Sequence, residues 1–113
     1  MDKNELVSNF SQELRRGTLI LCVLANLKEP TYGYSLIEKL SKTGISIEAN
    51  TLYPLLRRLE SQELLSSTWN TENTKPRKYY LLTDYGKEIL NELKNHWNNT
   101  VQSMKEILGE YDI

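Results

Sequence analysis

The sequence of 113 residues contains one cysteine, Cys22, and one histidine, His96. A structural zinc site usually takes about four Cys or His ligands, so these two residues cannot form one within a single chain. The sequence also has neither a glycine-rich phosphate loop nor the nucleophile turn of serine hydrolases. These absences argue against an enzyme, a metal site and a bound cofactor.

Long apolar segments are also absent. The longest apolar run, LILCVLA at residues 19–25, is far shorter than the ~20 residues that cross a bilayer. Cys22 lies within it and is expected to pack as a small hydrophobic side chain; a redox sensor is the alternative, which apolar surroundings disfavour. The N-terminal MDKNEL lacks the apolar region of a signal peptide. We therefore expect a cytoplasmic protein without a membrane-spanning segment.

The composition is that of a small globular domain. Hydrophobic residues make up 39% of the chain and charged residues 26%, and a chain of this length supports one domain with a small core. The net charge of −1 is unevenly distributed: residues 50–83 carry five positive and three negative charges, whereas residues 84–113 carry three and six. A locally basic surface can bind nucleic acid although the whole protein is acidic.

Residues 47–60, IEANTLYPLLRRLE, predict an amphipathic helix. Its apolar stripe has the spacing i, i+3, i+4, i+7 and consists of Leu52, Leu55, Leu56 and Leu59. The remaining positions carry residue types that bind phosphates or base edges: Asn50, Thr51, Tyr53, Pro54, Arg57 and Arg58. The pattern is typical of a recognition helix, although a surface helix with two solvated arginines fits it too. Because proline is tolerated mainly in the first turn, we expect the regular helix to start at residues 48–51.

Two helices are expected before it. Apolar periodicity predicts one long helix over residues 5–27, in which Gly17 marks a bend or a close contact. A short helix follows from residue 31 and stops at Gly44. Two short helices with a tight connection form a helix-turn-helix pattern.

Residues 64–69 and 77–82 predict a β-hairpin. Lys75 lies in its loop, and Arg77 and Lys78 begin the returning strand. A hairpin after a helix-turn-helix is a wing, and basic residues at its tip suit a DNA backbone or minor groove. Solvated surface charge is the alternative interpretation.

The final segment predicts a long amphipathic helix that Thr83 caps. Its stripe covers roughly 25 residues, about 37 Å at 1.5 Å per residue, and consists of Ile89, Leu90, Leu93, Trp97, Val101, Met104 and Leu108. A small core cannot cover that length. We expect a second copy of the chain to cover it, together with the Phe10 part of the first helix, although the helix could instead fold back on its own chain.

Four segments in this order, LRRGTLILCVLANL, PTYGYSLIEKL, TLYPLLRRLE and PRKYYLLTDYGKEIL, resemble the PadR family of bacterial transcriptional regulators. The resemblance covers nearly the whole chain, and the single last helix resembles the family's short subgroup. It implies a winged helix-turn-helix fold, a homodimer, and repression at a pseudo-palindromic operator in double-stranded DNA, often near the protein's own gene. By match to the family, the expected DNA contacts are Asn50, Thr51, Tyr53 and Arg57, with wing contacts from Lys75, Arg77 and Lys78.

Together these patterns predict a mainly α protein with a small β-hairpin. Residues 1–83 are expected to form the winged helix-turn-helix domain and residues 84–113 the dimerisation helix. The expected interface residues are Phe10, Leu93, Trp97, Val101 and Met104. Similar short regulators hold flat aromatic compounds near a tryptophan of the last helix, so the resemblance extends to a planar aromatic effector at Trp97, against the simpler interpretation that Trp97 only packs. The alternative function is a winged-helix module that binds a protein partner and neither DNA nor an effector.

Overall fold

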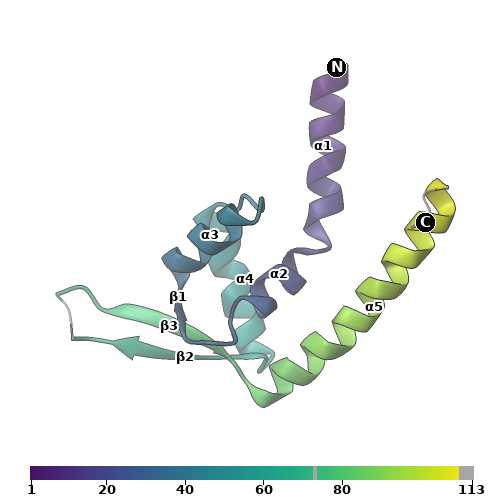
Figure 1. Cartoon of the computed structure of the whole chain (residues 1–113). Coiled ribbons are helices and arrows are strands. Elements are labelled where there is room, and N and C mark those ends of the chain that lie inside the picture. Colours follow the sequence, from purple (N-terminus) through teal and green to yellow (C-terminus); the bar gives the residue numbers. More distant parts are fainter. Residues whose placement is uncertain (73, 110–113) are drawn as a thin grey trace.

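The computed structural model describes residues 1–72 and 74–109 (Figure 1). The elements in chain order are α1 (Lys3–Arg16), α2 (Leu19–Ala25), β1 (Thr31–Tyr32), α3 (Gly33–Lys42), α4 (Ala49–Ser61), β2 (Leu65–Asn70), β3 (Arg77–Leu82) and α5 (Asp84–Leu108). The expected fold class, mainly helical with a small β-hairpin and a long last helix, is confirmed. Among the described residues, no helix combines the length and the apolar character needed to cross a membrane.

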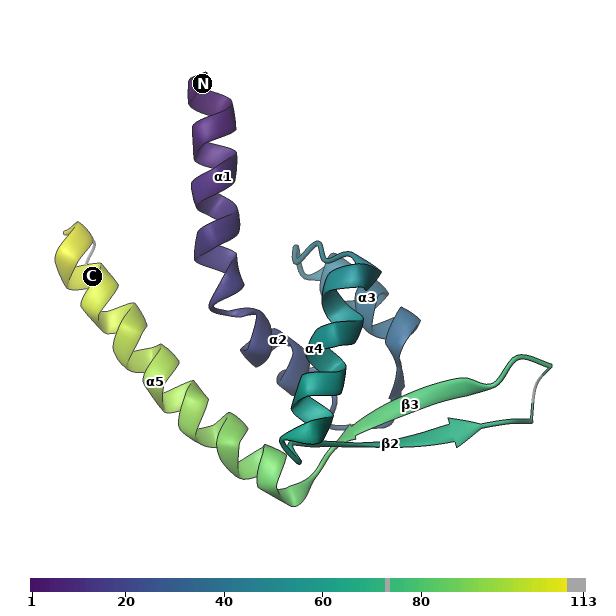
Figure 2. The same ribbon diagram turned by 180° about the vertical axis from the view of Figure 1, so that it is seen from behind.

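The core lies where α2, α3 and α4 meet the sheet and the start of α5 (Figures 1 and 2). It consists almost entirely of aliphatic side chains: Val23, Leu24, Leu27, Leu36, Leu40, Leu52, Leu56, Leu59, Leu64, Leu65, Tyr80, Leu82 and Leu90. The apolar stripe of α4 therefore faces inward as expected, with Leu55 only partly buried. Leucine side chains of this kind each contribute about 1.5–3 kcal/mol when fully buried.

The expectation of one helix over residues 5–27 is wrong, because the chain bends between α1 and α2 at Gly17 and Thr18. Glycine has a low helix propensity, and the Thr18 hydroxyl donates a hydrogen bond of 2.9 Å to the Arg15 carbonyl oxygen, which competes with the helical pattern. Beyond its chain neighbours, no described atom lies within 4 Å of the place of a Cβ on Gly17. Gly17 thus marks a bend and not a close contact, and α1 projects from the core (Figure 2).

The sheet has three antiparallel strands in the order β1-β3-β2. The hairpin of β2 and β3 matches the prediction, with Leu65 opposite Leu82 and Asn70 opposite Arg77. Strand β1 was not predicted, because its two residues are too few to show an alternating pattern. Thr31 of β1 pairs with Tyr80 of β3. β1 joins the start of α3 to the hairpin.

Helix α4 starts at Ala49, inside the expected interval. Pro54 is its sixth residue and so lies in the second turn, beyond the expected first turn. Because proline has no N–H, it cannot donate the helical hydrogen bond to the carbonyl oxygen of Asn50. The helix continues because its apolar face is buried on both sides of the proline, at Leu52 and Leu56.

The start of α5 is fixed to the core. Thr83 caps it as expected, with the Thr83 hydroxyl accepting a 2.9 Å hydrogen bond from the Gly86 amide. Gly86 packs so closely on the Leu64 carbonyl that a Cβ would overlap that oxygen. Leu90 is buried, and beyond Leu93 the helix leaves the core (Figure 1). The proposed division at residue 83 stays a prediction, although the first turns of α5 share the core of the preceding domain.

Candidate nucleic-acid interface

The four residues of α4 that were expected to contact DNA do not share one face. Asn50 and Arg57 are exposed and seven residues apart, which places them on the same side of the helix, nearly two turns from each other. Thr51 is also exposed but lies about 100° further round, where it lines a hollow beside α1 and α2. Tyr53 is partly buried. Asn50 and Arg57 are therefore the two that are presented together.

Tyr53 packs against the beginning of α3. A Cβ on Gly33 would lie 2.7 Å from Cε1 of Tyr53 and 3.0 Å from its hydroxyl oxygen, so glycine at this position makes room for the ring. Burial raises the pKa of the Tyr53 phenol above its ordinary value, and the neighbouring Tyr32 and Tyr80 add to the rise. The apolar periodicity of the α4 sequence does not predict this packing, because the contact joins α4 to a different helix, α3.

The three basic residues of the hairpin have different surroundings. Lys75 is exposed in the loop. Arg77 is exposed too, and its guanidinium carbon lies 5.1 Å from the centre of the Tyr32 ring, within the range of a cation–π interaction. Lys78 is turned to the other face of the hairpin, where its Nζ lies 3.3 Å from Oε1 of Glu60 on α4.

Glu60 links α4 to both strands of the wing. Its carboxylate accepts one hydrogen bond from the Ser67 hydroxyl and another from the Lys78 ammonium group. The bond from Ser67 and the attraction to Lys78 hold the pKa of Glu60 below its ordinary value, although partial burial acts in the opposite direction. Burial opposes the charge on Lys78, but the hydrogen bond and the attraction to Glu60, with the nearby Tyr80, raise its pKa. Both groups are therefore charged at neutral pH and compensate each other.

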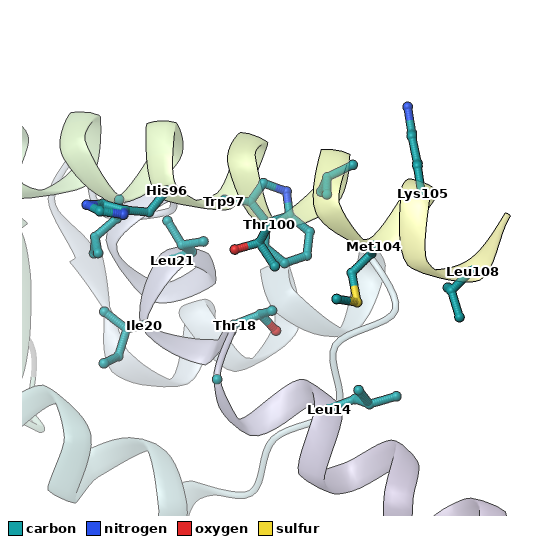
Figure 3. A pocket seen from close by; sticks show the side chains of 13 residues that line it. Leu14, Thr18, Ile20, Leu21, His96, Trp97, Thr100, Met104, Lys105 and Leu108 are labelled. Carbon is teal, nitrogen blue, oxygen red and sulfur yellow. The ribbon is translucent and has the colours of Figure 1, made fainter. Parts of the chain in front are cut away.

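A second feature is a groove of about 720 Å³ between α5 and the α1–α2 bend (Figure 3). Its walls are mostly apolar: Leu14, Gly17, Thr18, Ile20, Leu21, Leu93, His96, Trp97, Thr100, Val101, Met104, Lys105 and Leu108. Figure 3 shows Trp97, Thr100 and Met104 extending from α5 toward the bend. Four of the five expected interface residues line this groove. The fifth, Phe10, is 56% exposed on α1.

No group of three or more His, Cys, Asp or Glu side chains among the described residues could hold a metal ion. Cys22 is a partly buried free thiol that packs against the core.

Two short helices, α3 and α4, are followed by a hairpin that lies beside α4 and pairs with a short strand before α3. This arrangement, with exposed polar residues on α4 and basic residues on the hairpin, defines a winged helix-turn-helix protein.

Comparisons with known proteins agree with this assignment to the winged helix-turn-helix class. Residues 20–100 match the transcriptional regulator PadR-like family. The chain is 50% identical to a PadR family transcriptional regulator from Eggerthella lenta, with a TM-score of 0.89 and coverage of 93% of this chain and 94% of that one. A PadR-like regulator from Bacillus cereus is 33% identical, with a TM-score of 0.76 and coverage of 85% and 96%. A transcriptional regulator of Mycobacterium tuberculosis is 32% identical over 82 residues, 72% of this chain and 77% of that protein.

The chain belongs to the PadR-like family of transcriptional regulators. Members of the family are regulators and not enzymes, which confirms the expectation for this chain. They bind DNA and typically dimerise.

Proposed function

We propose that this protein is a dimeric, sequence-specific DNA-binding repressor of its own or a neighbouring operon. In this proposal α4 enters the major groove, and the wing lies along the adjacent backbone or minor groove. The observation that carries it is the exposure of Asn50 and Arg57 on one side of α4, beside a hairpin that presents Lys75 and Arg77. Asn and Arg pair with adenine and guanine edges, and Lys and Arg bind phosphates. Such a regulator works in the cytoplasm, where bacterial DNA is found.

The residues of α4 and the wing receive different roles. Arg57 and Asn50 are proposed to contact base edges, and Thr51 the backbone. Tyr53 is proposed to hold α4 against α3, so that any DNA contact it makes comes from the ring edge. Lys75 and Arg77 are proposed to contact phosphates, whereas Lys78 acts mainly through its pairing with Glu60.

A second copy of the chain is the proposed cover for α1 and the outer half of α5. These two helices carry most of the exposed large apolar side chains: Leu6, Val7, Phe10, Leu14, Trp97, Met104, Ile107 and Leu108. Apolar residues gathered in this way mark an interaction surface, and a two-fold dimer is the commonest assembly that would cover both helices. Two α4 helices would then read half-sites about one helical turn apart.

A planar aromatic effector is proposed for the part of the groove around Trp97. A volume of about 720 Å³ falls in the range of roughly 300–1,000 Å³ that is usual for small-molecule sites. The 44% exposed indole of Trp97 offers a face for stacking. Because the groove borders both α1 and α5, a ligand that prefers one arrangement of the two subunits would shift the spacing of the α4 helices and release the operator.

The proposal is tested by fluorescence anisotropy with labelled DNA duplexes. One duplex carries the region upstream of the protein's own gene, and the other has the same base composition in shuffled order. We expect tighter binding to the first, and an affinity that falls steeply with salt because phosphate contacts release counterions. Equal affinity for both duplexes would contradict specific recognition. Absence of salt-dependent binding to either would favour a protein-interaction module.

A further inference from the structure

A second basic surface borders α4 on the side away from the wing. It is a hollow of about 360 Å³, lined by Arg16, Leu19, Ile20, Thr51, Pro54, Leu55 and Arg58. Glu60 marks the wing side of α4, because its carboxylate binds Ser67 and Lys78. Arg58 precedes Glu60 by two residues, or about 200° around the helix. Basic residues therefore flank α4 on both sides.

The bend at Gly17 and Thr18 brings Arg16 to this hollow. Arg16 is the last residue of α1, and with the chain turning directly after it, Arg16 lines the same hollow as Thr51 and Arg58 of α4. Both Arg16 and Arg58 are exposed, and within residues 1–72 and 74–109 neither forms an ion pair. Two cationic side chains around one hollow repel each other, and an anion bound between them offsets that repulsion by attracting both.

The chemistry of the hollow suits a phosphate diester. Guanidinium groups present several N–H donors in a planar fork that matches phosphate oxygens. The Thr51 hydroxyl adds a further donor of a type that commonly contacts DNA backbones. Leu19, Ile20 and Leu55 form an apolar floor, which limits hydration of an ion pair and strengthens it.

We propose that Arg16 and Arg58 bind a backbone phosphate of the DNA strand that borders the major groove on the side opposite the wing. The inference rests on the proposed function, because it places α4 in that groove. A major groove is bordered by phosphates on both sides and is about 12 Å wide. The wing takes one border and the hollow takes the other, so α4 is held from two sides. Arg16 and Arg58 thereby fix the depth and register of α4 without reading sequence.

A simpler role for Arg16 is to balance the negative end of the α1 dipole. Arg15 lies in the same last turn and shares that role, but it does not line the hollow. Arg15 is therefore the matched control for Arg16.

The experiment measures operator affinity over a series of salt concentrations for the full chain and for Arg16→Gln, Arg58→Gln and Arg15→Gln. The slope of log K against log salt is negative, and each lost phosphate contact reduces its magnitude by about 0.9, or about 1.8 for a dimer with two equivalent contacts. We expect this decrease for Arg16→Gln and Arg58→Gln, with a roughly tenfold loss of affinity that is equal for operator and shuffled DNA. Arg15→Gln should match the wild type. Arg16→Lys and Arg58→Lys, which keep the charge, should restore most of the slope.

Wild-type slopes in both glutamine variants would overturn the inference and leave the proposed function standing if the operator is still bound. A wild-type protein that binds no DNA would overturn both. A second measurement changes the DNA and not the protein: single neutral methylphosphonate linkages are placed in turn along each half-site. We expect one linkage whose neutralisation lowers the operator affinity of the wild type and of the Lys75→Ala variant but leaves the affinity of Arg16→Gln unchanged. If no such linkage exists, the phosphate contact is absent even where a glutamine variant folds poorly.

Discussion

Glu60 on α4 and Lys78 on β3 form an ion pair of 3.3 Å that ties the helix to the wing. The two side chains are 31% and 29% exposed, so the pair is only partly screened by water. Ser67 on β2 donates to the same carboxylate. One side chain of α4 therefore holds both strands of the hairpin, and the direction of the wing depends on a group that does not need to touch DNA.

Replacing Glu60 with glutamine should change how stability depends on pH. A carboxyl group whose pKa is lowered in the folded state stabilises the protein above its unfolded pKa, about 4.3 for glutamate, and this stabilisation is lost as pH falls through the lowered value. We expect Glu60→Gln to cost about 0.2–1 kcal/mol at pH 7 and to lose less stability than the wild type below pH ~4. Urea denaturation at several pH values measures both. Parallel stability curves for the two proteins would show that Glu60 is not held in its charged form.

Two glycines of the chain should respond to alanine in opposite ways. In Gly86→Ala the new Cβ overlaps the Leu64 carbonyl oxygen and lies 2.9 Å from Cδ2 of Leu82, which should cost at least about 1–3 kcal/mol. Gly17 has a φ of −70° and open space around it, so Gly17→Ala should be neutral or should stabilise the protein by about 0.4–1 kcal/mol. The free energies of unfolding of the two variants provide the comparison. Equal destabilisation would contradict the packing at Gly86.

Charges on the uncovered apolar surface should separate the dimer without unfolding the subunit. Phe10 and Met104 are 56% and 43% exposed in the single chain, so Phe10→Glu and Met104→Glu should leave its fold intact and bury an unpaired charge only in the dimer. Tyr85→Glu serves as the control, because Tyr85 is 52% exposed near the start of α5. Sedimentation velocity should show monomers for the first two variants and dimers for the control. A dimer that persists in all three would place the interface elsewhere.

Arg57 and Lys75 should differ in their effect on specificity. Arg57→Ala should cost about 1–3 kcal/mol at one operator base pair and reduce the preference for that base, because a bidentate contact to guanine is lost. Lys75→Ala should weaken binding to all sequences equally and make the fall of log K with log salt shallower. Competition titrations with single-base operator variants distinguish the two outcomes. A uniform loss in Arg57→Ala would assign that side chain to the backbone.

Trp97 provides an optical test for an effector. The chain has two tryptophans, Trp69 on the hairpin and Trp97 in the groove. In a Trp69→Phe background Trp97 is the only tryptophan, so planar aromatic compounds that stack on it should quench its emission and weaken operator binding at the same concentrations. No quenching by a varied panel, with no change in operator affinity, would leave Trp97 as a packing residue.

The sequence predicted most of the helical fold because its signals are local. Leu52, Leu56 and Leu59 recur at helical spacing and are buried together. Thr83 precedes an acidic first turn, a pattern that predicts an N-cap, and it does cap α5. The single helix over residues 5–27 was wrong because an apolar stripe persists across Gly17, whereas the backbone bends there. Strand β1 was not predicted because two residues are too few to show the alternation of apolar and polar residues that indicates a strand.

The candidate site was predicted less completely, since its arrangement depends on contacts between elements. Periodicity placed Tyr53 off the apolar stripe of α4, but only the approach of Gly33 shows that its ring packs. Lys78 was grouped with Lys75 and Arg77 because the three are close in sequence, although strand alternation and Glu60 turn it to another face. The cluster of Arg16 and Arg58 joins residues 42 positions apart, and no local pattern connects them.

All buried hydrophobic side chains of the described residues lie between Val23 and Leu90, and α1 has no buried residue. One chain thus completes its core without a partner, so we expect subunits to part and pair again without unfolding. Differently tagged populations should then exchange partners at rates well above the rate of unfolding. When folded subunits are scarce, the amount of paired regulator rises with the square of their concentration. Gene control by this protein would therefore respond more sharply to its cellular level than control by a regulator that binds as a single chain.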